Sequence, residues 1–510
     1  LLLVFVALPG TSSSPCSKRL YPSLSETRIV CVCNATYCDE YEEIPLTADS
    51  AQVYSSSEGG DRMSARSVPI SHGYQGSWLS ARINVNPAVT YQEIIGFGGA
   101  FTDAAGINIA SLSAPSQERL MQSMYGKKGA RYSIGRVPMA GNDFSTTIYS
   151  YDDHPGDVNM SQFALAEADL KYKIPFITRA LNLTGGDLRL FSSPWSAPAW
   201  MKTTGKSKVA RAVYIVTLDQ HNILYSRFFE EYLAHGISFW ATTVQNEPST
   251  GAIPFWEWQT MYWSANGEKN FVTQYLGPAL RASNASKNVK IIGLDDQRVF
   301  LPLWAYELYS DPVASSYYAG MGLHWYFDAV APAPVMSAVH QSYPDKFILY
   351  TEACAGWVPF IQGPVLGEWS RVESYARSII EDLNNYVAGW TDWNIALNMQ
   401  GGPTWVPNYV DSPILVNDAT DEFLKQPMHY AMTHFSRFLR PGAKRVQSSI
   451  SGLDAIGVHH TAFVGTDGNR VVTVLNTSKF AKEVVVEDTE GTSIKVNVAP
   501  KSITSVIWKK

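Results

Sequence analysis

The sequence is poor in charge, in cysteine and in long apolar runs, and these shortages exclude several classes of protein. Charged residues make up 17% of the 510 residues and apolar residues 45%, which is typical of a packed globular chain and not of a disordered one. The net charge is −6 and there is no strongly basic block, so the electrostatic pattern of a nucleic-acid-binding protein is missing. After the first residues, no apolar stretch reaches the roughly 20 residues that a membrane-spanning helix needs. Internal repeats and low-complexity tracts are also lacking.

The first 14 residues, LLLVFVALPGTSSS, join an apolar core to small residues. This segment is too short to cross a bilayer and is typical of the hydrophobic region and cleavage zone of a secretory signal. Because the sequence starts at Leu1 without methionine, we expect the charged beginning of that signal to be missing from it. A buried N-terminal strand is the alternative, which the proline and serines that follow at once disfavour.

Four of the five cysteines lie close together, at Cys16, Cys31, Cys33 and Cys38. Such a cluster is typical of a disulfide-stapled segment in an oxidising compartment, and four cysteines allow three pairings. Cys31 and Cys33 are poorly placed to bond each other, which favours Cys33–Cys38 and Cys16–Cys31. A zinc site is the competing hypothesis, and the lack of a nearby histidine argues against it.

Five Asn-x-Ser/Thr triplets are candidate glycosylation sites. Each triplet is weak evidence alone, but together with a secretory signal they indicate a glycoprotein. The five asparagines are Asn34, Asn159, Asn182, Asn284 and Asn476.

Short apolar runs alternate with helical patterns from about Tyr91 to Leu397, for example at Ser116–Met124 and Arg371–Leu383. Strand–helix alternation over about 300 residues predicts parallel βαβ units, and a (β/α)8 barrel has this length. The last 60 or so residues contain evenly spaced short strands, which predict an all-β sandwich.

The apolar runs of the middle section share one property: polar, aromatic or acidic residues stand where each run ends. In a barrel, such endings surround one mouth, which is where barrel active sites lie. Eight endings are found, the number that a barrel needs: GFGGAFTDAA, RVPMAGNDFS, SSPWSAPAW, QNEPST, LDDQR, LHWYFD, YTEACAGW and WTDWNIAL.

Two glutamates stand out among these endings. Glu247 follows the run FWATTVQN and Glu352 follows KFILYT. Glycoside hydrolysis uses two carboxyl groups beside the scissile bond, and a closed barrel can bring two distant strand ends together. A salt bridge or a solvated rim position is an equally good reading of either glutamate alone. The tryptophans at other endings, Trp195, Trp325 and Trp393, favour the catalytic interpretation of the pair.

The motifs of the chain, taken in order, resemble the glucosylceramidases of glycoside hydrolase family 30. The resemblance runs nearly end to end. It rests on the strand endings above and on CVCNATYCD, LGP, GGP, NYVDSPI, KQPM and HFSRF, which begin at Cys31, Leu276, Gly401, Asn408, Lys425 and His434.

The resemblance implies an α/β plus all-β fold: a (β/α)8 TIM barrel with an immunoglobulin-like β-sandwich and a small disulfide-stapled antiparallel β domain. It also implies how the chain is divided, with residues 1–14 as a signal remnant. The expected domains are 15–42 with 395–426 for the small domain, 43–91 with 443–510 for the sandwich, and 92–394 with 427–442 for the barrel.

The resemblance further implies that Glu247 is the acid/base and Glu352 the nucleophile of a retaining β-glucosidase. The other implied roles fall into two groups. The glucose subsite would be lined by Asp143, Trp195, Asn246, Trp393 and Asn408, and the carboxylates would be supported by Arg136, His324 and Tyr326. These residue types suit the task, because carboxylate and amide groups bind hydroxyls, indole faces pack on a pyranose, and a donor such as Tyr326 keeps a carboxylate ionised.

The implied substrate is glucosylceramide, and the implied setting is an anionic lipid surface in the lysosome with a saposin-type activator and delivery by a membrane receptor. No cofactor is implied, and no metal-ligand pattern is evident in the sequence. Two alternatives stay open: a relative that cleaves another β-linked glycoside (a fucoside, xyloside or β-1,6-glucan), and a catalytically silent carbohydrate-binding protein.

Three places depart from the family pattern. Gln245 replaces the expected glutamate before Asn246, and Lys206–Gln220 lacks the usual glycines. The two segments Ala252–Gln259 and Gly356–Trp369, expected at the barrel rim, are aromatic but differ from the family's sequence, so they leave the aglycone preference open. The fifth cysteine, Cys354, is expected to be a small buried apolar side chain, with a reactive thiol as the alternative.

Overall fold

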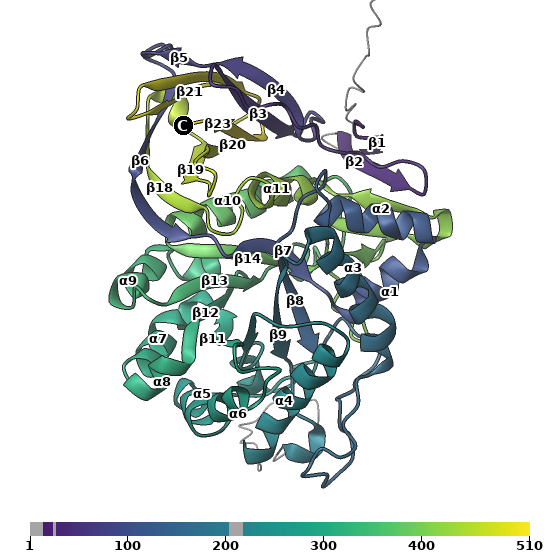
Figure 1. Ribbon diagram of the computed structural model, residues 1–510. Helices are drawn as coiled ribbons and strands as arrows, with labels where there is room; N and C mark the ends of the chain where they lie inside the picture. Colours follow the sequence, from purple (N-terminus) through teal and green to yellow (C-terminus); the bar gives the residue numbers. More distant parts are fainter. Residues whose placement is uncertain (1–13, 24–26, 203–217) are drawn as a thin grey trace, which may run out of the picture.

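Eight parallel strands close into a barrel in the computed structural model, which describes residues 14–23, 27–202 and 218–510 (Figure 1). Each strand pairs with its neighbours in chain order, and the last pairs with the first. The strands end at the eight predicted polar endings, which confirms the barrel. They are β7 (Gly96–Ala100), β8 (Ile134–Met139), β9 (Arg189–Pro194), β10 (Ala241–Thr243), β11 (Lys290–Gln297), β12 (Tyr318–His324), β13 (Phe347–Glu352) and β14 (Val387–Asn394).

Helices cover the outer face of the barrel, and all of those that the structure describes except α11 lie between consecutive barrel strands. In α10 (Trp369–Asn384), the buried residues Val372, Tyr375, Ile379 and Leu383 recur every three or four positions, so one apolar stripe packs on the barrel. The others are α1 (Asp103–Ser111), α2 (Ala114–Tyr125), α3 (Ile174–Thr184), α4 (Leu218–Ala234), α5 (Ala265–Phe271), α6 (Gly277–Ala282), α7 (Leu301–Tyr309), α8 (Pro312–Tyr317), α9 (Pro334–Ser342) and α11 (Pro427–Ser436).

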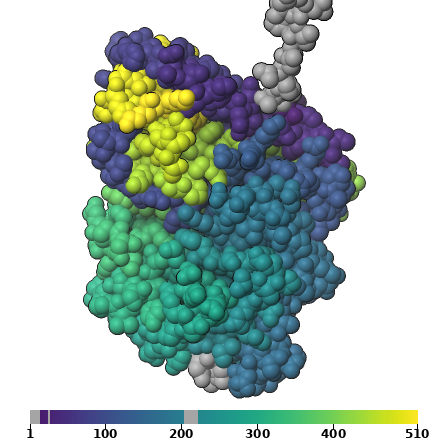
Figure 2. Space-filling view, viewed as in Figure 1, coloured from purple at the N-terminus to yellow at the C-terminus, as the bar shows by residue number. Residues whose placement is uncertain are grey.

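Ten strands from both ends of the chain form one sheet that folds over on itself and encloses an apolar core, as the predicted β-sandwich requires. Figure 2 shows the purple N-terminal and yellow C-terminal residues mixed in this part of the surface. Helices α10 and α11 lie between it and the barrel (Figure 1). In sheet order the strands are β4 (Ser64–Pro69), β3 (Ser50–Ser57), β23 (Ser502–Trp508), β20 (Arg470–Asn476), β19 (Val458–Val464), β18 (Lys444–Ser451), β6 (Ala81–Glu93), β21 (Lys482–Asp488), β22 (Thr492–Val498) and β5 (Ser71–His72).

A small third sheet carries the clustered cysteines. Its order is β1 (Lys18–Pro22), β2 (Thr27–Asn34), β17 (Glu422–Lys425), β16 (Ile414–Asn417) and β15 (Leu397–Asn398). The strands pair antiparallel, as expected, except at one edge, where β15 and β16 pair in parallel. The structure contains the disulfides Cys16–Cys31 and Cys33–Cys38, the pairing that the spacing favours.

Two further predictions concern the chain as a whole. The proposed signal segment falls on residues 1–13, outside the described part of the chain, apart from Ser14. Within the described residues, no helix combines the length and the apolarity needed to span a membrane. The domain boundaries given above stay a prediction.

Candidate active site

The two glutamates lie at the carboxyl ends of the barrel strands and come close together. Glu352 is the last residue of β13, and Glu247 stands four positions after the end of β10. A carboxylate oxygen of each and a ring nitrogen of His324 lie within 4.8 Å of one another. Both glutamates line a cavity of about 540 Å³. The two glutamates are more than 100 positions apart in the sequence, and the closed barrel places them side by side.

The backbone at Glu247 is strained where the chain turns after β10. Glu247 has φ 42°, in the left-handed region that a glutamate rarely adopts. Its N–H donates to the carbonyl of Asp295 (2.9 Å), and the N–H of Asn246 donates to that of Pro194 (2.9 Å). These two bonds fasten the segment to the neighbouring strands β11 and β9, so the acid side chain is presented on a rigid support.

Arg136 on β8 holds the second carboxylate. Its Nη1 donates to Glu352, while Nη2 donates to Asn246 Oδ1 (2.7 Å) and Asp295 Oδ2 (2.8 Å). The guanidinium is fully buried and lies 4.9 Å from the ring centre of Trp195. A single cation thus joins β8, β11, β13 and the segment after β10, and balances the charge of two carboxylates.

His324 on β12 bridges the acid/base candidate to the same network. Its Nδ1 lies 3.1 Å from Glu247 Oε1, and its Nε2 lies 3.0 Å from Asp295 Oδ1. Burial alone would lower the pKa of His324, but Glu352, Asp295 and Glu247 outweigh it and raise this pKa to about 10. At neutral and acidic pH the ring is therefore an imidazolium that donates to both carboxylates.

Asp295 is the central residue of the network, and sequence reasoning missed it. Besides Arg136 and His324, it accepts hydrogen bonds from Ser193, Thr243 and Thr351, at 2.6–3.0 Å. Burial would raise its pKa, but Arg136 and His324 hold the pKa of Asp295 well below the usual range. The only signal in the sequence was the ending LDDQR, which does not say which aspartate faces inward.

Tyr326 and Cys354 adjoin the nucleophile candidate. The Tyr326 hydroxyl donates to Glu352 Oε1 (2.7 Å) and lies 3.5 Å from Cys354 Sγ. Burial raises the pKa of Glu352, opposed by the charges of His324 and Arg136. Burial also raises the pKa of Cys354 well above the usual range, so this thiol is neutral and weakly nucleophilic. The structure thus favours an inert, buried Cys354.

The residues expected to bind glucose all line the cavity. Asp143 accepts from Asn408 Nδ2 (2.8 Å), and burial and the nearby Glu352 raise the pKa of Asp143 to about 8. Trp195 and Trp393 stack on each other, with ring centres 5.0 Å apart. One face of each ring is therefore covered by the other ring, which leaves at most the opposite face of each ring for a sugar.

The outer part of the cavity is apolar. It lies between the two aromatic segments, 252–259 and 356–369, and the turn that contains η6 (Asp328–Val330). Phe255 is 92% exposed and Phe360 is fully exposed, as no core residue would be. The apolar residues that line this part are Ile253, Trp256, Trp258, Val299, Phe300, Phe327, Val330, Trp357 and Pro359.

Gln245 turns away from the acid/base candidate. Its Nε2 donates to the carbonyls of Trp195 (2.7 Å) and Asn246 (3.0 Å), and the residue is fully buried. An ionised glutamate could not make these bonds, because it has no hydrogen to donate to a carbonyl. The glycine-poor segment Lys206–Gln220 lies outside the described residues, apart from the start of α4.

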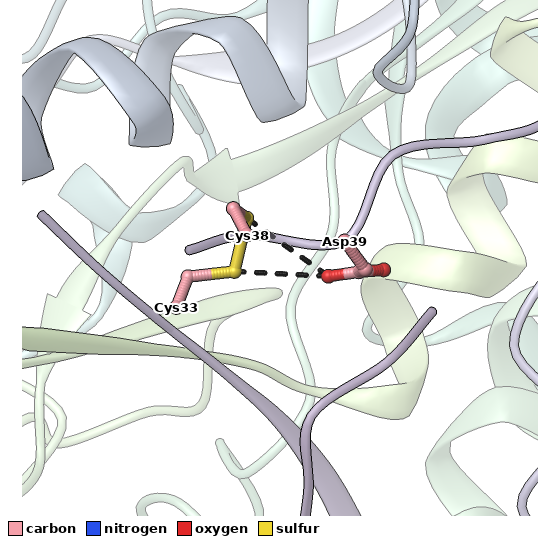
Figure 3. A group of neighbouring side chains, drawn as sticks. All are labelled: Cys33, Cys38 and Asp39. Atoms are coloured by element: carbon pink, nitrogen blue, oxygen red, sulfur yellow. Dashed lines mark hydrogen bonds between the residues drawn. A yellow bond between two sulfur atoms is a disulfide. The ribbon is translucent and has the colours of Figure 1, made fainter. Parts of the chain in front are cut away.

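Among the residues that the structure describes, two groups of side chains have the composition of a metal site, but neither suits one. In the first, the sulfur atoms of Cys33 and Cys38 are joined in a disulfide beside Asp39, so they offer no thiolate (Figure 3). Asp39 itself is bound by Lys425 Nζ (2.9 Å) and the Tyr430 hydroxyl (2.8 Å). In the second, Glu247, His324 and Glu352, both ring nitrogens of the histidine already face carboxylates.

The structure separates the five candidate glycosylation sites. Asn159, Asn182 and Asn284 are exposed, and Asn34 is partly exposed. Asn476 is fully buried, and its Nδ2 donates to the carbonyls of Phe480 (2.9 Å) and Ala499 (2.8 Å). A glycan on that nitrogen would replace one of its two hydrogens and remove at least one of these bonds, which argues against a glycan on the folded chain at Asn476. Glycan attachment at the five asparagines stays a prediction.

Comparison with known proteins agrees with this geometry. Residues 94–439 match the family model described as "Glycosyl hydrolase family 30 TIM-barrel domain", and residues 442–506 match the "Glycosyl hydrolase family 30 beta sandwich domain". The chain is 44% identical to "Putative glucosylceramidase 3" of Caenorhabditis elegans, over 100% of this chain and 98% of that protein. It is 37% identical to the "Lysosomal acid glucosylceramidase" of Mus musculus, over 98% and 96% of the two chains. The crystal structure of SrfJ from Salmonella typhimurium superposes with a TM-score of 0.82 at 27% identity, covering 90% of this chain and 100% of that one.

Proposed function

Because the chain belongs to glycosyl hydrolase family 30, we propose that it is a retaining β-glucosidase that hydrolyses glucosylceramide to glucose and ceramide. The observation that carries the mechanism is the separation of the carboxylates, whose oxygens lie within 4.8 Å of each other. Retaining enzymes keep their carboxyl groups about 5–5.5 Å apart, whereas inverting enzymes leave roughly 6.5–9.5 Å for a water molecule.

In the first step, the Glu352 carboxylate attacks the anomeric carbon while Glu247 gives its proton to the glycosidic oxygen. The carbon–oxygen bond to ceramide breaks, ceramide leaves as the alcohol, and a glucosyl ester forms on Glu352. In the second step, the Glu247 carboxylate takes a proton from water, the hydroxide attacks the anomeric carbon, and Glu352 is released. Arg136 and Tyr326 support this role of Glu352, because both donate to its carboxylate oxygens.

We assign glucose binding to Asp143, Asn246 and Asn408, whose polar groups line the cavity beside the two glutamates. Trp195 and Trp393 form the apolar wall of this subsite. An amide near the 2-hydroxyl contributes most in the transition state, where that contact strengthens.

The ceramide portion is assigned to the apolar outer part of the cavity, and the exposed Phe255 and Phe360 to contact with a lipid surface. An anionic membrane, a saposin-type activator and a lysosomal location complete the proposal. The lysosomal location rests on the likeness to the mouse protein named lysosomal acid glucosylceramidase, and the membrane and the activator rest on the family resemblance of the sequence alone.

Azide rescue of two variants tests the assignment of the carboxylates. Glu247→Ala should form the glucosyl-enzyme from an activated aryl glucoside and then stall, since no base remains to activate water. Azide needs no base and should give the β-azide. Glu352→Gly opens space beneath the anomeric carbon, so azide should attack the β-glucoside directly and give the α-azide. An α-azide from Glu247→Ala, or ordinary hydrolysis by Glu352→Gly, would contradict the assignment.

The substrate is tested by presenting glucosylceramide and galactosylceramide in anionic vesicles at acidic pH, together with aryl glucosides, fucosides and xylosides and a β-1,6-glucan. We expect cleavage of glucosylceramide to dominate. If the protein cleaved a soluble glucoside but neither lipid, the assignment of a lipid substrate would be refuted. The assignment of a glycosidase activity would stand. Turnover of any aryl β-glycoside excludes a silent binding protein.

A further inference from the structure

Gln297, the last residue of β11, contacts the acid/base candidate directly. Its Nε2 lies 3.1 Å from Glu247 Oε1, the same oxygen that faces His324 Nδ1 at 3.1 Å. Among the residues that the structure describes, none donates a hydrogen bond to the other oxygen, Glu247 Oε2. One carboxylate oxygen therefore has two nitrogen donors, and the other is left for the cavity that both residues line.

The orientation of the Gln297 amide is fixed by its own contacts. Its Oε1 accepts from the backbone N–H of Phe327 (3.2 Å), and its backbone N–H donates to Asp296 Oδ1 (2.7 Å). Rotating the amide by half a turn would place its NH2 against the N–H of Phe327 and its oxygen against Glu247 Oε1. Both new contacts would be repulsive, so the NH2 group stays toward Glu247.

An oxygen that accepts two N–H groups has no room for a proton of its own. We propose, on the basis of the function proposed above, that Gln297 is a positioning residue of the acid/base: with His324 it holds Glu247 Oε1 as an acceptor, so that Oε2 carries the proton that passes to the glycosidic oxygen. After the first step, the same two donors hold the carboxylate that accepts a proton from water. A neutral amide serves both halves of the cycle because it donates without changing charge.

The surroundings explain why a neutral donor is suited to this position. The charged groups near Glu247 are His324 on β12, Glu352 on β13, Asp295 and Asp296 on β11, Arg136 on β8, and Asp143 in the loop after β8. Carboxyl groups thus outnumber cations. A further carboxylate at position 297 would add repulsion to Glu247, whereas a further cation would discourage Glu247 from keeping its proton.

Gln297→Met, which keeps the length of the side chain but removes both polar groups, tests the proposal by its dependence on the leaving group. An octyl β-glucoside needs its leaving oxygen protonated, and a 2,4-dinitrophenyl β-glucoside does not. We expect kcat/KM to fall about tenfold or more for the octyl glucoside and less than about threefold for the aryl glucoside. Gln341→Met makes the same substitution at an exposed residue of α9 that does not line the cavity, and should leave the ratio of the two substrates unchanged.

Gln297→Glu adds a second measurement, the pH profile. This profile should not change if Gln297 only packs against its neighbours. When protonated, the new carboxyl can still donate to Glu247; when ionised, it loses this donor and repels Glu247. Both effects disfavour the ionised form of Glu247, so the alkaline limb of the octyl glucoside profile should move to higher pH, with a smaller change for the aryl glucoside. Thermal melting checks that each variant is folded.

Equal losses on both substrates in Gln297→Met, or no loss on either, together with an unmoved pH limb in Gln297→Glu, would overturn the inference while the proposed function stands. Failure of the wild-type protein to cleave either glucoside would overturn both.

Discussion

At the scale of single residues, the adjacent aspartates Asp295 and Asp296 have different environments because β11 carries a bulge. Leu294 and Asp295 both have positive φ, 70° and 56°, and the register with β12 shifts between Leu294 and Asp296. Asp295 turns into the buried network of Arg136 and His324, whereas Asp296 lines the cavity. Burial and the nearby Glu247 raise the pKa of Asp296 to about 6. The bulge thus separates a permanently charged aspartate from one that titrates.

Replacing Asp143 should damage catalysis more than replacing an aromatic residue far from the cavity. Asp143→Ala removes a carboxyl that we assign to two sugar hydroxyls, so we expect kcat/KM on an aryl β-glucoside to fall by about 100-fold or more. Phe480→Ala, at a residue 74% exposed in the sandwich, should change it less than about twofold. Near-normal turnover by a folded Asp143→Ala variant would show that the glucose subsite is wrongly assigned.

At the scale of elements, a buried carboxyl joins α5 to the strand that carries the bulge. Glu268 on α5 accepts from the N–H of Leu294 on β11 (3.4 Å) and from Trp304 Nε1 on α7 (3.1 Å). Burial raises the pKa of Glu268 to about 7. Since the folded protein holds this proton more tightly than the unfolded chain does, the stability from Glu268 is fully present below the unfolded pKa, about 4.5.

We therefore expect stability to depend on pH through Glu268. As pH rises from about 4.5 through 7, the wild-type protein should lose about 3 kcal/mol of unfolding free energy relative to Glu268→Gln, which cannot titrate. Urea unfolding of both proteins at several pH values measures this difference. The loss of a hydrogen bond in the variant adds an offset that does not vary with pH, so only the slope is decisive. A difference that stays constant between pH 4.5 and 7.5 would contradict the prediction.

The aromatic rim segments should govern binding to lipid without governing the chemistry. Phe255→Ser and Phe360→Ser each remove an exposed aromatic side chain, and we expect each to weaken binding to anionic vesicles roughly tenfold. Turnover of a soluble aryl glucoside should be unchanged. Phe480→Ser makes the same substitution on the sandwich and serves as the control in vesicle sedimentation. Equal vesicle binding by all three variants would argue against a lipid-facing rim.

At the scale of the whole molecule, the two ends of the chain are needed in one sheet. Strand β23, the last of the chain, pairs with β3 near its beginning and with β20. Trp508 on β23 is fully buried in the sandwich core, and its Nε1 donates to Asp488 Oδ2 (3.0 Å). The sandwich in turn contacts α10 and α11, which pack on the barrel.

Trp508→Ala should consequently destabilise the protein by about 3–5 kcal/mol through the cavity it leaves. Trp78→Ala, at a residue 79% exposed, is the matched control and should change stability by less than about 0.5 kcal/mol. Chemical denaturation measures both. Because Trp508 lies far from the cavity, the folded variant should retain its activity at low temperature. A loss below 1 kcal/mol for Trp508→Ala would contradict the assigned core position.

The sequence by itself determined the barrel and the candidate site at its mouth. Apolar runs that end on polar residues are a local property of the chain, and parallel strands in a barrel bring such endings to one rim. For this reason Glu247 and Glu352 could be singled out from the pattern alone, whereas the expected glucose-binding residues came from the family resemblance. The disulfide pairing also followed from spacing, because short loops restrict which cysteines can meet.

Only the tertiary structure decided which contacts those residues make with one another. The inward turn of Asp295 depends on a bulge, and the contact of Gln297 with Glu247 depends on the exact depth at which β10 and β11 end. The mutual stacking of Trp195 with Trp393 and the burial of Asn476 depend on packing between distant segments. Local pattern fixes which residues reach a surface, but contacts across 50 or more positions are set by how strands register when the barrel and the sandwich close.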